Sequence, residues 1–106
     1  MKLINTAIIT TALLITTAPA FAGDAAAGKA VYNGKGCIGC HGAGGGSPVT
    51  SNPPTPSLAG QSAAYLKHSL TGFKSGTRQN PTMNAMAAML GDADIDNVAT
   101  YLSSQK

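Results

Sequence analysis

The five residues Cys37-Ile38-Gly39-Cys40-His41 constrain this 106-residue chain more than any other feature. Two thiols and an imidazole lie within one short segment, and these two cysteines are the only ones in the sequence. Such a group can hold a metal ion, exchange electrons as a disulfide, or attach a larger cofactor. Each use demands other residues or a particular fold, so the rest of the chain discriminates among them.

Zinc binding and thiol–disulfide exchange both lack what they need elsewhere in the sequence. A structural zinc ion takes four ligands, but beyond Cys37, Cys40 and His41 the chain offers only one more histidine, His68. A thiol exchanger places C-x-x-C at a helix start within a β-α-β framework. No alternating strand pattern of useful length is present, so the sequence disfavours both interpretations.

The third interpretation is covalent attachment of haem, for which C-x-x-C-H is the known signature. The two thiols would bond to the vinyl groups of one porphyrin, and His41 would lie under the iron as its proximal ligand. The chain has no tryptophan, only two phenylalanines and 13 glycines. A short chain with so little side-chain bulk needs a large apolar cofactor to complete its core. The sequence therefore predicts one haem c, bound through Cys37 and Cys40.

The N-terminal segment has the pattern of an export signal. Lys2 provides a positive start, an apolar run follows, and Ala20-Phe21-Ala22 fits a signal-peptidase site. The run is shorter than the ~20 residues that span a bilayer, which favours cleavage over retention as a membrane anchor. We predict a cleaved signal peptide over 1–22, one domain over 23–106, and a periplasmic location.

The remainder of the chain predicts an all-α domain with long loops. Three helices are expected, each with a capping side chain: 25–33 after Asp24, 63–74 after Ser62, and a closing helix capped by Asp92. One apolar face of the closing helix is formed by Ile95, Val98, Ala99 and Leu102. The glycine- and proline-rich segment 42–56 predicts a coil that wraps around something.

A second side chain on the iron would close it to small molecules and favour electron transfer. The candidates are Met83, Met86, Met89 and His68. His68 lies off the apolar stripe of its helix and is interpreted as exposed, whereas Met86 and Met89 look like core contacts on a short helical turn. Met83 follows Asn80-Pro81-Thr82, interpreted as an irregular segment from which a loop side chain turns inward. The pattern favours Met83, with Met86 as the alternative.

Taken together, these motifs resemble the class I c-type cytochromes, and within them the small bacterial c4, c5 and c553 group. The similarity extends over nearly all of 23–106 and is carried by GDAAAG at 23–28, CIGCH, PSLAGQ at 56–61, Tyr65-Leu66, SGTR at 75–78, Met83, and LGDADI at 90–95 with Tyr101. The resemblance implies the class I cytochrome c fold, with three to five helices and long loops wrapped around one covalently bound haem.

The resemblance also implies roles for single residues. In this family the axial methionine lies seven residues before the leucine of the L-x-D turn, which here is Leu90, so the iron ligand would be Met83. The carbonyl of Pro56 would accept the Nδ1 proton of His41 and strengthen its bond to iron. Arg78 resembles a family arginine near the haem propionates, with a solvated surface charge as the alternative.

Three further features bear on the family comparison. Gly28 and Tyr32 resemble the contact at which the first and last helices of the family cross closely. The segment 42–56 is longer and richer in glycine and proline than in typical c4 domains. One C-x-x-C-H is present, whereas c4 proteins carry two. The chain is therefore similar to a single-haem relative, or to one half that pairs with another chain.

The resemblance implies a periplasmic one-electron carrier rather than an enzyme, with transient redox partners such as a membrane oxidase or reductase. A net charge of +3 is too small to argue for nucleic acid. Four lysines near CIGCH are expected to steer partners: Lys29, Lys35, Lys67 and Lys74. Two alternatives stay open: a haem protein whose sixth site binds a small gas, and a haem subunit of a larger enzyme. We expect a monomer, with a dimer as the alternative.

Overall fold

The computed structural model describes residues 23–48 and 55–105, so the predicted signal peptide and part of the predicted coil at 42–56 lie outside the described residues. Its helices are α1 (Ala25–Gly34), α2 (Cys37–His41), the 3-10 helix η1 (Ala43–Gly45), α3 (Ala63–Ser75), α4 (Pro81–Ala88) and α5 (Asp92–Ser103). No strand occurs within the two described ranges. The prediction of an all-α domain is confirmed.

The caps of α1 and α3 are those that the sequence indicates. The carboxylate of Asp24 accepts hydrogen bonds from the N–H groups of Ala26 and Ala27, at 2.9 and 3.1 Å. The hydroxyl of Ser62 accepts one from the N–H of Tyr65 at 3.1 Å. These contacts satisfy N–H groups that have no partner inside the first turn of a helix. Both helices therefore begin at the predicted residue.

The start of α5 differs from the prediction. Asp92 is the first helical residue, and the capping position belongs to Gly91. The carboxylate of Asp94 reaches back and accepts the N–H of Gly91 at 3.0 Å. An acid three residues into the helix satisfies this N–H without a side chain at the cap, so Asp92 is left in the first turn, where the helix dipole favours a negative charge.

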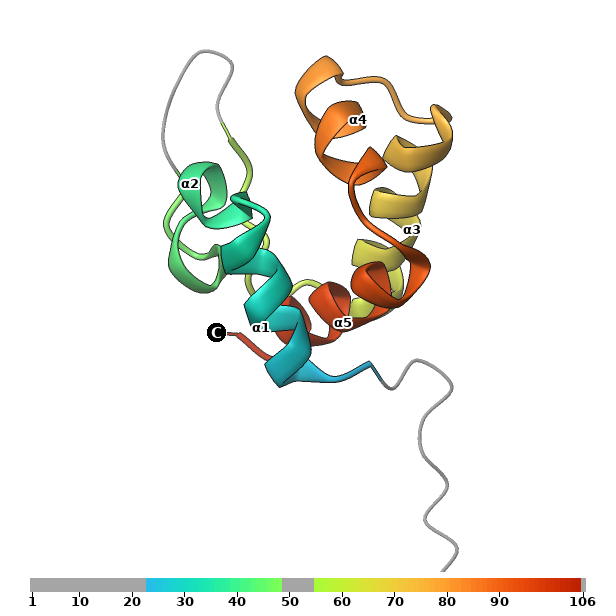
Figure 1. Cartoon of the computed structure of the whole chain (residues 1–106). Coiled ribbons are helices and arrows are strands. Elements are labelled where there is room, and N and C mark those ends of the chain that lie inside the picture. The colour runs from blue at the N-terminus through green and yellow to red at the C-terminus, as the bar shows by residue number, and fades with distance from the viewer. Residues whose placement is uncertain (1–22, 49–54, 106) are drawn as a thin grey trace, which may run out of the picture.

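Helices α1 and α5 cross at the base of the molecule (Figure 1). A Cβ added to Gly28 would collide with the carbonyl of Asn97 and lie 2.9 Å from the Cβ of Tyr101, so the crossing requires glycine here. Tyr32 is fully buried, and its ring centroid lies 5.7 Å from that of Tyr101. The predicted close contact between the first and last helices is confirmed.

Two arms rise from this crossing (Figure 1). One carries α2, and the other carries α3 and α4. The apolar face predicted for α5 is buried throughout, and the main core cluster consists of Tyr32, Leu66, Val98, Ala99, Tyr101 and Leu102. The core thus lies at the base, where the two arms meet.

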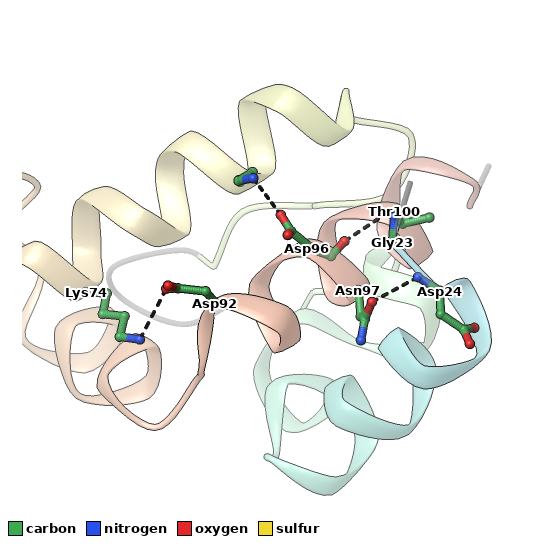
Figure 2. Close-up of polar contacts among 8 residues, drawn as sticks. Gly23, Asp24, Lys74, Asp92, Asp96, Asn97 and Thr100 are labelled. Carbon is green, nitrogen blue, oxygen red and sulfur yellow. Dashed lines mark hydrogen bonds and ion pairs between the residues drawn. The ribbon is translucent and has the colours of Figure 1, made fainter. Parts of the chain in front are cut away.

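Polar contacts tie α5 to both neighbouring helices (Figure 2). The backbone N–H of Asp24 donates to the side-chain oxygen of Asn97 at 2.9 Å. The Lys67 ammonium lies 2.8 Å from the carboxylate of Asp96, which joins α3 to α5. Within the described part of the chain, no helix is long and apolar enough to cross a membrane.

Candidate functional site: an apolar cavity between the two arms

The C-x-x-C-H motif forms a short helix of its own, α2. Gly36 before it and Gly42 after it have φ values of +84° and +81°, a backbone region that favours glycine. Since residues three and four apart share one face of a helix, Cys37, Cys40 and His41 lie on the same side of α2. The sequence did not predict this helix, because five residues are too few for a periodic pattern.

A cavity of about 350 Å³ lies between α2, α3, α4 and α5. Five of the six residues predicted to bind the cofactor line it: Cys37, His41, Pro56, Arg78 and Met83. Apolar and aromatic side chains line it as well: Tyr32, Leu66, Leu70, Phe73, Leu90, Val98 and Leu102. Its volume and largely apolar lining are typical of cofactor sites.

The two cysteines differ in exposure. Cys37 is half-buried and lines the cavity, whereas Cys40 is exposed and does not. Burial raises the pKa of the Cys37 thiol above its ordinary value. A thiol exchanger needs the opposite, a lowered thiol pKa that supplies the reactive thiolate. The environment of Cys37 therefore disfavours the thiol-exchange alternative.

His41 is held by the chain segment that follows η1. The imidazole is 6% exposed, and its Nδ1 lies 2.8 Å from the carbonyl oxygen of Pro56. Because a carbonyl only accepts, Nδ1 carries the proton, and in the neutral imidazole Nε2 then keeps its lone pair. The neighbouring segment is fastened to the carbonyl of Gly45 by the N–H of Leu58 at 2.8 Å and the hydroxyl of Ser57 at 3.1 Å. The contact that the resemblance implies between His41 and Pro56 is thus present.

Met83 lines the cavity from α4, and this location corrects the expected local structure. The segment is not irregular: the side chain of Asn80 accepts the N–H of Met83 at 3.0 Å, and Pro81 is the first residue of α4. An asparagine cap followed by proline is a helix-start signal, and it overrides the expectation of a loop. Met86 does not line the cavity, and Met89 is 50% exposed, so the core contact predicted for Met89 is wrong.

Arg78 and His68 occupy different surroundings. The guanidinium carbon of Arg78 lies 4.6 Å from the ring centroid of Phe73, in the range of a cation–π contact. Its side chain is exposed and also lines the cavity. This position is compatible with a role near the haem propionates and with a solvated surface charge. His68 is exposed on α3 and does not line the cavity.

Two of the four lysines expected to steer partners near CIGCH are paired with aspartates of α5. Lys74 lies 3.7 Å from the carboxylate of Asp92, and Lys67 pairs with Asp96, so both lie on the side of α3 that faces α5 (Figure 2). Neither lysine lines the cavity. The sequence predicted a cap role for Asp92, and its spacing did not indicate that α3 would lie beside Asp92 and Asp96.

The buried hydroxyl of Ser69 indicates that another molecule occupies the cavity. Its side chain is 8% exposed, lines the cavity, and has no hydrogen-bond partner for Oγ among the described residues. A buried hydroxyl without a partner costs about 1–3 kcal/mol. An occupant with polar atoms at its edge and an apolar body would fit both this hydroxyl and the apolar walls, as a haem would.

The class of protein follows from the motif, the cavity and the fold. An all-helical chain that brings C-x-x-C-H to the wall of an apolar cavity has the architecture of a c-type haem protein. Within residues 23–48 and 55–105, no group of three His, Cys, Asp or Glu side chains is placed to hold a metal ion.

The chain belongs to the cytochrome c family, whose model matches residues 25–106. It is 42% identical over 85 residues to cytochrome c4 of Pseudomonas aeruginosa, across 80% of this chain and 40% of that protein. It is 41% identical over 88 residues to cytochrome c-554(548) of Halomonas halodenitrificans, across 80% of this chain and 100% of that protein. The structure of reduced cytochrome c4 from Pseudomonas stutzeri matches with a TM-score of 0.69 and 31% identity, over 77% of this chain and 48% of that chain.

These similarities confirm a class I c-type cytochrome that resembles the c4 group. Family membership also makes covalently bound haem c the cofactor. The chain spans less than half of the two c4 proteins and the full length of cytochrome c-554(548).

Proposed function

We propose that this protein is an exported, single-haem electron carrier and not an enzyme. In this proposal Cys37 and Cys40 hold the haem, and His41 and Met83 ligate its iron. The observation that supports it is the shared cavity: His41 on α2 and Met83 on α4 line it from opposite arms of the molecule (Figure 1). The haem would supply one-electron exchange between ferrous and ferric iron.

The residues around the cavity have separate tasks in this proposal. The carbonyl of Pro56 holds the His41 ring by its Nδ1 and would leave Nε2 available to bind the iron. The thioether of Met83 is a soft ligand that favours ferrous iron, and the apolar walls exclude water, which favours it further. Arg78, exposed at the edge of the cavity, would pair with the haem propionates.

Partners would meet the molecule at the exposed side of α2. Ile38 is 38% exposed and Cys40 is exposed beside it, so this part of the motif reaches the surface. A small interface of this kind suits transient encounters with an electron donor and an acceptor, such as a membrane oxidase or reductase. Because Lys67 and Lys74 pair with aspartates, charge steering would depend on fewer lysines than the sequence indicated.

Export would remove residues 1–22 and deliver the domain to the periplasm. The backbone N–H of Gly23 donates to the hydroxyl of Thr100 at 3.1 Å, and a new amino terminus at Gly23 would keep this donor (Figure 2). Mass spectrometry of the haem protein from the periplasmic fraction should give a chain that begins at Gly23. A chain that still begins at Met1 and sediments with membranes would indicate an anchor instead.

Replacement of Met83 tests the proposed ligation directly. The wild-type ferric protein should show the far-red absorption band of iron-bound methionine, and the reduced protein should not bind carbon monoxide. Met83→Ala should keep the covalent haem, lose the band and bind carbon monoxide, because the sixth position is then open. Visible spectra of the ferric, reduced and carbon monoxide-treated proteins give all three readings.

Met86→Ala and Met89→Ala are matched controls on the same part of the chain. Neither side chain lines the cavity, so both variants should keep the band and resist carbon monoxide. If the wild-type protein binds carbon monoxide readily, the sixth position of the iron is open. The protein would then bind small gases, and the proposal of an electron carrier would be wrong. If only Met86→Ala loses the band, Met86 and not Met83 is the iron ligand.

A further inference from the structure

Asn84 follows Met83 on α4, and its side chain joins three separate backbone groups. Its Nδ2 donates to the carbonyl of Phe73 at 2.8 Å and to the carbonyl of Arg78 at 2.9 Å. Its Oδ1 accepts the N–H of Asn80 at 2.9 Å. One amide therefore connects the last turns of α3, the segment between the helices and the cap of α4.

The two asparagines also bind each other. The backbone N–H of Asn84 donates to the carbonyl of Asn80 at 2.7 Å, while the side chain of Asn80 accepts the N–H of Met83 at 3.0 Å. The first turn of α4, which contains Met83, is thereby fastened to the end of α3. Asn84 itself does not line the cavity, so any effect on an occupant acts through Met83.

Helix α4 depends on these hydrogen bonds because it is short. It has eight residues, fewer than an isolated helix requires for stability in water. Only one of its side chains, Ala87, is buried, so apolar packing holds it weakly. The hydrogen bonds of Asn84 therefore provide much of what orients the first turn relative to α3.

We propose that Asn84 is a positioning residue for the iron ligand: it holds the first turn of α4 against α3 so that Met83 stays in the wall of the cavity. This inference rests on the proposed function, in which Met83 binds the iron. Without Asn84, α4 would move away more readily, and another ligand would displace Met83 from the iron more easily.

Competition with imidazole measures how firmly Met83 is held. The ferric holoprotein is titrated with imidazole while the far-red methionine band is followed, for wild type, Asn84→Ala and Asn84→Asp. In Asn84→Ala the apparent dissociation constant of imidazole should fall about tenfold, since three side-chain hydrogen bonds are lost and each contributes modestly. Asn84→Asp keeps the acceptor for Asn80 but places oxygens against the carbonyls of Phe73 and Arg78. Its dissociation constant should fall at least as far.

Asn97→Ala is the matched control. Asn97 is also a half-buried asparagine whose side chain accepts a backbone N–H, that of Asp24, but it lies at the base of the molecule (Figure 2). This variant should lower the thermal midpoint and leave the imidazole dissociation constant within about twofold of wild type, because the contact is remote from Met83.

The outcomes separate this inference from the proposed function. An unchanged imidazole constant in both Asn84 variants would overturn the positioning role, and so would an equal fall in Asn97→Ala, which would show a global effect. A wild-type protein without the methionine band would instead overturn the ligation by Met83, and the positioning role with it. A tenfold fall confined to the Asn84 variants supports both.

Discussion

At the scale of single residues, Tyr32 contributes to the core, to the wall of the cavity and to the hydrogen bonding of the C-x-x-C-H segment. It is fully buried, lines the cavity, and donates its hydroxyl proton to the carbonyl of Gly42, directly after the C-x-x-C-H helix, at 2.5 Å. Burial raises its pKa to about 12, because the phenolate form would lose its hydration. The same residue thus connects the core, the cavity and the end of α2.

Tyr32→Phe should lower the free energy of unfolding at pH 7 by about 1 kcal/mol, since one buried hydrogen bond is lost. The carbonyl of Gly42 keeps a bond from the N–H of Gly45 at 3.0 Å, which limits the cost. Denaturant titration at equilibrium measures the difference between the two proteins. No difference at pH 7 would contradict a stabilising role for this hydrogen bond.

The pH dependence of this difference has a definite sign. Tyrosine in the unfolded chain ionises near pH 10, and buried Tyr32 only near pH 12. The stability of the wild type relative to Tyr32→Phe is therefore constant below pH 10 and falls by up to about 2.7 kcal/mol as the pH rises from 10 to 12. Because this fall exceeds the advantage of about 1 kcal/mol at pH 7, Tyr32→Phe should become the more stable protein towards pH 12. An advantage that stays constant to pH 12 would contradict the raised pKa.

At the scale of elements, the crossing of α1 and α5 fixes the base from which both arms rise. Gly28 permits the crossing, whereas Gly34 ends the same helix in open space, where an added Cβ would meet no neighbouring atom within 4 Å. A substitution at Gly28 therefore changes both helix propensity and the contact with α5, whereas one at Gly34 changes helix propensity alone.

Gly28→Ala should lower the free energy of unfolding by about 2 kcal/mol, because the overlap with α5 outweighs the gain of roughly 1 kcal/mol in helix propensity. Gly34→Ala should leave it unchanged or raise it by up to about 1 kcal/mol. Thermal unfolding followed by circular dichroism compares the two variants. A Gly28→Ala protein as stable as Gly34→Ala would show that the helices do not cross this closely.

At the scale of the whole molecule, the core and the cavity share their walls. Tyr32, Leu66, Val98 and Leu102 belong to the main core cluster and also line the cavity. Few large side chains are available elsewhere, since the chain has no tryptophan and two phenylalanines. The cofactor would therefore form part of the core itself, and folding and haem attachment should be coupled.

The double variant Cys37→Ala/Cys40→Ala should lose the haem and its cooperative thermal transition. The walls of the cavity would then lack an apolar partner, and so short a chain has little other core. Far-ultraviolet circular dichroism during heating measures this. Ile38→Ala changes an exposed residue of the same helix and should keep both haem and transition. A haem-free double variant that melts cooperatively at the wild-type midpoint would show that the chain folds independently of its cofactor.

Local chemistry was predictable from the sequence alone. The caps at Asp24 and Ser62, the apolar face of α5 and the C-x-x-C-H signature each depend on residues a few positions apart, and the resemblance extended these to the fold and to the contact between His41 and Pro56. One error was also local. An irregular segment was predicted at the start of α4, although an asparagine followed by proline is itself a helix-start signal.

Only the tertiary structure decided which distant residues meet. It brought α5 beside α3, which paired Lys67 and Lys74 with aspartates. It placed Met83 rather than Met86 or Met89 in the cavity wall, and it joined Asn84 to the end of α3. Spacing along a chain encodes the period of one helix, whereas the angle and register between helices arise from all their packed side chains at once.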